Sequence, residues 1–111
     1  MGLSALAGDV EVAVLTATFD AKPGSEEALA AALARYVVLT RNEPGCRNVD
    51  LVASATHGGR VLVIEKWDGA DLVQGHLDSP LMTDMAGEVL PLLASKPDID
   101  LYDTISAHDL M

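Results

Sequence analysis

Two segments of the sequence alternate in the manner of β-strands yet carry apolar side chains on both faces. Residues 10–19 place valines and threonines on one face and Leu15 and Phe19 on the other. Residues 61–67 place two valines on one face and Leu62 and Ile64 on the other. Such strands need cover on both sides of their sheet, because an open apolar face would be a large exposed patch.

Three further segments are predicted to be helices, two of them from apolar residues at helical spacing. The first helix is predicted to begin after an N-cap at Ser25 and to end near Arg41, before a Glu-Pro-Gly sequence that must break it. A short helix is expected over residues 68–77, with an aspartate as its cap. The next helix begins at Ser79-Pro80, where a capping residue precedes a proline at the first helical position.

Two more strands complete the pattern. The strand that begins at Cys46 is predicted to place this cysteine on one face with Asn48 and Asp50. A Gly-Gly turn then joins it in a hairpin to the strand at 61–67. Residues 99–105 alternate as the last strand.

The element order is therefore β-α-β-β-α-β, which predicts an α+β fold with a four-stranded antiparallel sheet and helices on one face. The second apolar face of the sheet is expected to be buried in a homodimer, sheet against sheet. The alternative is that the N-terminal arm, residues 1–9, covers the sheet alone. The domain itself is expected over residues 10–106, followed by a tail at 107–111.

Charge and cysteine content exclude several classes of protein. Seventeen acidic residues against seven Lys and Arg give a formal net charge of −10. This balance argues against nucleic acid and anionic membranes as partners, because both are bound through basic residues. No apolar run approaches the roughly 20 residues that span a bilayer, and no signal peptide is recognisable. A single cysteine permits no internal disulfide, so a cytoplasmic location is expected, and no structural zinc site is indicated.

The most suggestive group of residues is Glu65, Trp67 and His76. Glu65 and Trp67 are two apart on a strand and therefore share its otherwise apolar face. An acid in such a place needs a partner, and His76, nine residues after Trp67, could return over the strand end as a base. The alternative assigns Glu65 to an ion pair with Arg or Lys, Trp67 to the core and His76 to a helix cap.

Other polar residues carry weaker signals. Asn48 and Asp50 could hold a substrate carbonyl or hydroxyl, although such pairs are commonly solvent-facing. His57 in the hairpin turn and His108 in the tail are expected to be exposed. Cys46 is interpreted as a small buried hydrophobic residue, because no cation is placed to lower its pKa.

Four short runs stand in a recognisable order and spacing along the chain. They are Ala21–Glu27, Arg41–Cys46, Glu65–Asp68 and His76–Pro80. Together they resemble the antibiotic biosynthesis monooxygenase family over about residues 10 to 106. The resemblance implies a ferredoxin-like protomer and a dimeric α+β barrel. It also implies relatives that oxygenate polyketide phenols, anthrones or quinols without a cofactor, and others that degrade haem.

The haem-degrading branch fits this chain poorly. The Asn, Trp and His that the branch uses fall on Ala17, His76 and Ala86 when counted onto this sequence. The quinol and polyketide branches instead typically carry the Glu-x-Trp and His-x-x-Ser-Pro runs that stand here. Their frequent aromatic residue is replaced by Val49, so substrate stacking is not expected at that position.

These observations lead to a hypothesis of a cofactor-independent monooxygenase that oxidises a small quinol, phenol or anthrone with dioxygen. No flavin, metal or haem is expected. His76 would be the base or proton shuttle, with Glu65 orienting it or a substrate hydroxyl. Trp67 would form an aromatic wall, and Asn48 and Asp50 would be further substrate contacts. The alternatives are a non-catalytic dimeric barrel that binds a small molecule and, with less support, a haem-binding relative.

Overall fold

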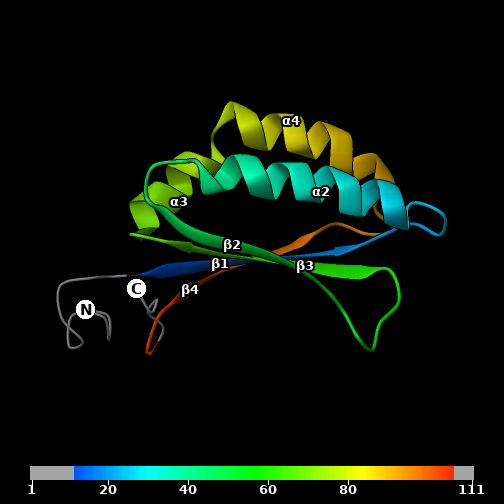
Figure 1. Ribbon diagram of the computed structural model, residues 1–111, viewed down its shortest axis with the longest axis horizontal. Coiled ribbons are helices and arrows are strands. Elements are labelled where there is room, and N and C mark those ends of the chain that lie inside the picture. Colours follow the sequence, from blue (N-terminus) through cyan, green and yellow to red (C-terminus); the bar gives the residue numbers. More distant parts are fainter. Residues whose placement is uncertain (1–11, 107–111) are drawn as a thin grey trace.

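The computed structural model describes residues 12–106, and its elements follow the predicted order (Figure 1). They are β1 (Ala13–Asp20), α2 (Glu26–Arg41), β2 (Cys46–Ala53), β3 (Arg60–Trp67), α3 (Ala70–Leu77), α4 (Pro80–Val89), the short 3-10 helix η1 (Leu90–Leu92) and β4 (Asp98–Asp103). Within residues 12–106, no helix is long and apolar enough to cross a membrane. The predicted arm at 1–9, the start of the first predicted strand and the tail at 107–111 with His108 lie outside the described residues.

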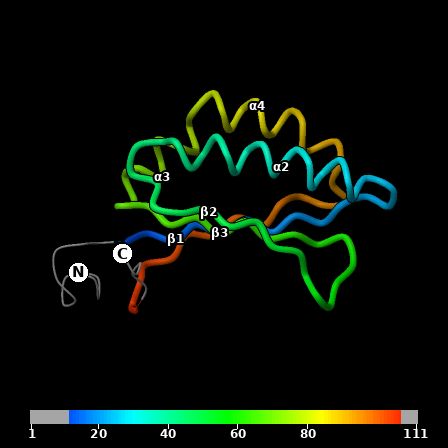
Figure 2. The backbone as a smooth tube through the Cα atoms, viewed as in Figure 1, coloured from blue at the N-terminus to red at the C-terminus, as the bar shows by residue number. Residues whose placement is uncertain are grey.

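The sheet is antiparallel throughout, in the order β2-β3-β1-β4. β3 and β1 are thus the central strands, in keeping with the apolar character of both their faces. All helices lie on one side of the sheet (Figure 1), with α2 and α4 next to each other above it (Figure 2). This is the ferredoxin-like α+β fold that the sequence predicts.

Each central strand directs one face to the helices and the other away from them. On β1, Leu15 is buried beneath the helices, whereas Val14 on the opposite face is half-buried. On β3, Val63 is buried on the helix side and Ile64 is half-buried on the open side. Among residues 12–106 no element covers that open side (Figure 1). That a second chain or the N-terminal arm buries this apolar side therefore stays a prediction.

β2 departs from the predicted alternation at its first residues. A register shift between Cys46 and Asn48 leaves Arg47 as an extra residue opposite β3. Cys46 therefore packs against the core on the helix side, and the prediction that it shares a face with Asn48 and Asp50 is wrong. Strict period-two counting fails here because a bulge reverses the face of every residue before it.

Two of the three predicted N-cap positions, Ser25 and Ser79, agree with the structure. Ser79 caps α4, its Oγ accepting a 3.4 Å hydrogen bond from a backbone N–H one turn on. Ser25 stands at the N-cap of α2, but its side chain makes no capping hydrogen bond. Asp68 does not cap α3, because Gly69 takes that position and the aspartate binds Arg47 at 2.6 Å instead.

The main hydrophobic core lies between the sheet and the pair of helices α2 and α4. Its fully buried side chains include Leu33 from α2, Val49 from β2, Val63 from β3 and Val89 from α4. A smaller cluster surrounds Trp67 beside α3. The two clusters meet at the middle of β1 and β3, where the candidate site lies.

Truncation of Leu33 tests this assignment of the core. The side chain is fully buried, so Leu33→Ala is expected to lower the free energy of unfolding by about 2–5 kcal/mol. Leu39→Ala is the matched control on the same helix, since that side chain is 53% exposed and should cost less than about 0.5 kcal/mol. Urea unfolding followed by the fluorescence of Trp67 measures both, and equal losses would contradict the assignment.

Candidate functional site

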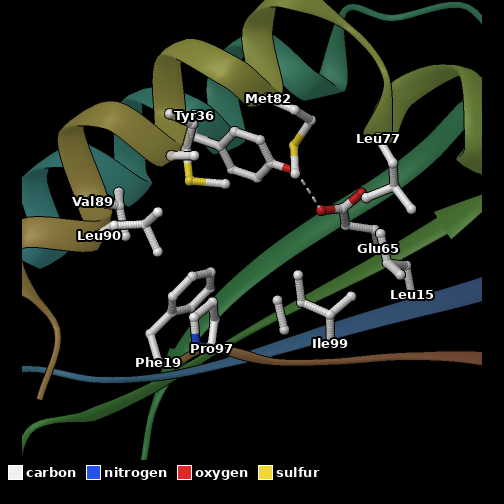
Figure 3. Close-up of a pocket in the computed structure, with 13 residues that line it drawn as sticks. Leu15, Phe19, Tyr36, Glu65, Leu77, Met82, Val89, Leu90, Pro97 and Ile99 are labelled. Carbon is white, nitrogen blue, oxygen red and sulfur yellow. Dashed lines mark hydrogen bonds between the residues drawn. The ribbon is translucent and has the colours of Figure 1, made fainter. Parts of the chain in front are cut away.

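A cavity of about 90 Å³ lies between the helix layer and the sheet (Figure 3). Most of its wall is apolar and includes Phe19 from β1 with Met82 and Met85 from α4. The polar side chains among its lining residues are those of Tyr36 and Glu65, which meet at one end (Figure 3). A ligand in this cavity would therefore be largely apolar and would meet hydrogen-bonding groups at that end.

The other end of the cavity approaches the protein surface. Leu90, Pro97 and Ile99 are among its lining residues. Leu90 is 51% exposed and Ile99 is 47% exposed. Entry from solvent is thus most direct past β4, the edge strand.

Local structure places Tyr36 and Glu65 opposite one another. Tyr36 follows the buried Leu33 by three residues on α2 and so points toward the sheet. Glu65 alternates with Val63 and Trp67 on β3 and so points toward the helices. The Tyr36 hydroxyl donates a 2.7 Å hydrogen bond to Oε2 of Glu65 (Figure 3).

The Glu65 carboxylate is nearly inaccessible, since the residue is 1% exposed. An ionised carboxylate without partners would be costly in this interior. Nε1 of Trp67 donates a 2.9 Å hydrogen bond to Oε1, and Tyr36 donates to Oε2, so each carboxylate oxygen has its own donor. Glu65 therefore has hydrogen-bond partners, as expected for an acid on an apolar face. These partners are two neutral donors, and not the Arg or Lys of an ion pair.

His76 joins this cluster from α3 and is 3% exposed. Its Nε2 atom lies 2.6 Å from the Tyr36 hydroxyl oxygen and 3.5 Å from Oε1 of Glu65. Its ring packs on Trp67 with 4.8 Å between ring centroids. The structure thus brings together Glu65, Trp67 and His76, the three residues singled out from the sequence.

The cavity wall does not include Trp67 or His76. Trp67 contacts the cluster by its hydrogen bond to Glu65 and its ring contact with His76, and its expected role as an aromatic wall stays a prediction. His76 reaches the cavity through the hydroxyl of Tyr36.

The second ring nitrogen of His76 faces Glu43, in the loop between α2 and β2. Nδ1 lies 2.5 Å from Oε2 of Glu43. Both atoms are buried, and neither has a hydrogen-bond partner elsewhere among the described residues, so each is the nearest polar group available to the other. His76 is consequently flanked by two acidic side chains, Glu65 and Glu43.

Glu65, Tyr36, His76 and Glu43 form a row of polar groups in contact, and the hydrogens available to these contacts can be counted. Three contacts join Glu65 to Tyr36, Tyr36 to Nε2 of His76, and Nδ1 of His76 to Glu43. With both carboxylates ionised, the hydroxyl supplies one hydrogen and a neutral imidazole supplies one more. One contact then lacks a hydrogen, and a protonated imidazole supplies it.

Tyr36 keeps its own hydrogen in this setting. Burial, reinforced by the Glu65 carboxylate, raises the pKa of Tyr36 far above its ordinary value. The side chain thus serves as a neutral donor and a relay between the cavity and His76, and does not act as a stable phenolate.

Sequence reasoning missed Tyr36 and Glu43 as members of the site. Tyr36 stands on the core face of its helix, and a buried phenol hydroxyl needs a hydrogen-bond partner. That need is the signal by which Tyr36 could have been found. Glu43 stands in a helix-breaking sequence, and nothing in its spacing indicates a contact with residue 76.

The remaining candidates lie away from the cluster. Asn48 and Asp50 bond to each other at 3.0 Å on the open side of the sheet, and the structure does not bring them to the cavity. His57 is exposed in the hairpin turn, as expected. Within residues 12–106, no group of three or more His, Cys, Asp or Glu side chains is placed to hold a metal ion.

The fold and its internal site define a small ferredoxin-like protein with a buried acid–tyrosine–histidine cluster. The chain belongs to the antibiotic biosynthesis monooxygenase family, whose model matches residues 13–88. The matched segment extends from β1 into α4 and so contains the whole cluster. No curated protein matches the chain.

Solved structures share this fold over most of the chain. Rv0793 from Mycobacterium tuberculosis is 26% identical with a TM-score of 0.81, and the match covers 88% of this chain and 99% of that one. Protein SO0527 from Shewanella oneidensis is 29% identical with a TM-score of 0.78, covering 86% and 93%. A structure described as an antibiotic biosynthesis monooxygenase is 20% identical with a TM-score of 0.77, covering 85% and 99%. At that identity the last likeness concerns the fold alone.

The thiol of Cys46 gives a direct test of the electrostatics near the cluster. Burial, reinforced by Glu65 and Glu43, raises the pKa of Cys46 to about 11. About a thousandth of the thiol is then ionised at pH 8, so iodoacetamide should react roughly a hundredfold more slowly than with the unfolded chain. The native rate should rise as pH approaches 11. Mass spectrometry follows the single product, and equal native and unfolded rates at pH 8 would contradict the shift.

Proposed function

We propose that this protein is a monooxygenase that oxidises a small electron-rich aromatic compound of the quinol, phenol or anthrone type with dioxygen, without flavin, metal or haem. The observation that carries the proposal is the hydrogen-bonded pair Tyr36–Glu65 at one end of an otherwise apolar cavity. An aromatic ring fits the apolar wall, and its hydroxyl or acidic C–H group fits the polar end. Membership of the antibiotic biosynthesis monooxygenase family supports the reaction class.

The chemistry comes from the substrate. Loss of a proton from its O–H or C–H bond leaves an electron-rich anion, which gives one electron to dioxygen. The resulting radical and superoxide combine to form a C–O bond, and protonation gives a hydroperoxide that loses water. One oxygen atom stays in the product and one leaves as water, while the substrate supplies all four electrons. The proton removed in the first step is returned when the peroxide is protonated. The protein therefore needs a pocket that excludes water and a base that releases its proton again.

The residues of the cluster divide this work. The hydrogen of Tyr36 turns from Glu65 to Nε2 of His76, which acts as the base, and passes to that nitrogen as the substrate proton moves to the tyrosine oxygen. Glu65 holds the tyrosine hydroxyl in line, and Trp67 holds Glu65 and packs on the His76 ring. Asn48 and Asp50 take no part, because they lie on the opposite side of the sheet.

Haem binding is not proposed for this chain. Both ring nitrogens of His76 are already in contact with Tyr36 and Glu43.

Oxygen uptake with a panel of hydroquinones, phenols and anthrones tests the function. Substrate-dependent uptake is expected, with one atom of ¹⁸O₂ in the product. His76→Ala and Tyr36→Phe should each lower turnover by about 10²- to 10⁴-fold, as expected for the loss of a base or its relay. His57→Ala is the matched control, because that histidine is exposed in the hairpin turn, and it should retain full turnover.

Two results would overturn parts of this proposal. Unchanged turnover in His76→Ala would remove the base assignment. Binding of panel members without any oxygen consumption would instead identify a non-catalytic small-molecule-binding barrel.

We also propose that two copies of the chain pair through the open sides of their sheets. The central strands present Val14, Leu62 and Ile64 on that side, half-buried within one protomer. Val52 of β2 and Tyr102 of β4 extend the apolar surface and are 44% and 49% exposed. Apolar sheet faces of this kind are typically buried by association, and a two-fold axis pairs the same surface with itself.

Sedimentation equilibrium at micromolar concentration tests the pairing. The mass should be about twice the 11.6 kDa of one chain. Ile64→Glu places a charge on a central strand of the open side and is expected to give monomers, because the charge would be buried unpaired. Ala31→Glu on the exposed surface of α2 is the control and should remain dimeric. A monomeric wild-type protein would contradict the proposal.

A further inference from the structure

Glu43 is held close to His76 by the turn that ends α2. Its backbone N–H donates a 3.0 Å hydrogen bond to the carbonyl of Thr40, and its own carbonyl accepts a 3.1 Å hydrogen bond from Cys46. Gly45 makes the turn with φ of +84°, a conformation that favours glycine. The carbonyl of Gly45 in turn accepts from the N–H of Asp68, beyond the end of β3. The loop is thus tied on both sides, and the glutamate faces the histidine from a fixed position.

The contact between Glu43 and His76 differs from the other contacts of the cluster in its access to solvent. The side chain of His76 is 1% exposed and that of Glu65 is 2% exposed, whereas the side chain of Glu43 is 26% exposed. Nδ1 of His76 and Oε2 of Glu43 are themselves buried, and neither has an aligned hydrogen-bond partner. Two buried polar atoms 2.5 Å apart are best satisfied by one hydrogen between them.

We propose that Glu43 is a positioning residue that keeps a hydrogen on Nδ1 of His76, so that Nε2 faces Tyr36 as an acceptor. A neutral imidazole carries one hydrogen, and the group opposite each nitrogen decides where it resides. A carboxylate opposite Nδ1 can only accept, so it selects the Nδ1–H form. Nε2 then carries no hydrogen and lies 2.6 Å from the oxygen of Tyr36, so the single hydroxyl hydrogen can turn from Glu65 to Nε2.

The inference deepens the proposed function and rests on it for its catalytic consequence. When the substrate O–H or C–H bond breaks, its proton moves to the oxygen of Tyr36 and the tyrosine hydrogen moves to Nε2. His76 then carries hydrogens on both nitrogens, and the ionised Glu43 balances the new positive charge. When the peroxide is protonated the same transfers run backwards, so His76 returns to its Nδ1–H form without rotating its ring. No outside oxidant or proton donor is needed beyond dioxygen.

Nuclear magnetic resonance of ¹⁵N-labelled histidine tests the inference without any substrate. Long-range ¹H–¹⁵N spectra identify which ring nitrogen carries hydrogen, and His57 and His108 serve as internal references. In the wild-type protein, Nδ1 of His76 should carry a hydrogen at every pH where the imidazole is neutral. In Glu43→Gln, the population with hydrogen on Nδ1 should fall at least fivefold, because an amide can donate to that nitrogen. Glu27→Gln, an exposed glutamate on α2, is the matched control and should leave the spectrum unchanged. An unchanged His76 spectrum in Glu43→Gln would overturn the inference.

Steady-state kinetics test the catalytic consequence of the contact between Glu43 and His76. With a panel member that supports oxygen uptake, Glu43→Gln should lower kcat about tenfold or more and leave KM within twofold, because Glu43 does not line the cavity. Glu43→Ala should be partly rescued by formate, which can enter beside a partly exposed side chain and replace the carboxylate. A purely structural role would give no rescue, and that result would contradict the inference. If no panel member supports uptake while the spectrum changes as expected, the monooxygenase proposal fails and the pairing of Glu43 with His76 stands.

Discussion

The cost of burying the Glu65 carboxylate determines how the two layers of this protein meet. The residue lies at 1% exposure between the helices and the sheet, where an ionised acid is tolerated only with hydrogen-bond donors at its oxygens. One donor is Trp67, two residues along the same strand, and the other is Tyr36 from α2. Because the second donor comes from the helix layer, the carboxylate fixes α2 against β3 at one position. The same bond leaves the tyrosine oxygen within reach of His76.

This arrangement separates the surface that a ligand would touch from the group that would hold its proton. Apolar side chains give the cavity little capacity to solvate charge, so the polar contacts of a ligand would be confined to the Tyr36–Glu65 end. His76 lies one layer further back, packed on Trp67 and shielded from the cavity. A base in that position would exchange protons with the cavity through its neighbours Tyr36 and Glu65.

Sequence patterns predict the order of the helices and strands. They also predict which residues of β3 share a face, because that strand alternates without interruption. Glu65 and Trp67 are therefore assigned to one face correctly, and His76 to the strand end that α3 covers. Counting fails on β2, where Arg47 is an extra residue and Cys46 turns to the other face. Tyr36 could be placed on the inner face of its helix but not opposite a particular strand residue, since helix periodicity carries no information about the crossing of α2 over β3. Glu43 depends on a loop conformation and is beyond pattern reasoning altogether.

The two faces of each central strand are apolar for two separate reasons. On β1, Leu15 lines the cavity and contributes to the core under α3, whereas its neighbour Val14 lies on the side that no helix covers. On β3, Glu65 belongs to the site and the adjacent Ile64 belongs to the open side. Successive residues of a strand point to opposite sides, so one short segment can serve an internal site and an association surface without sharing a side chain between them.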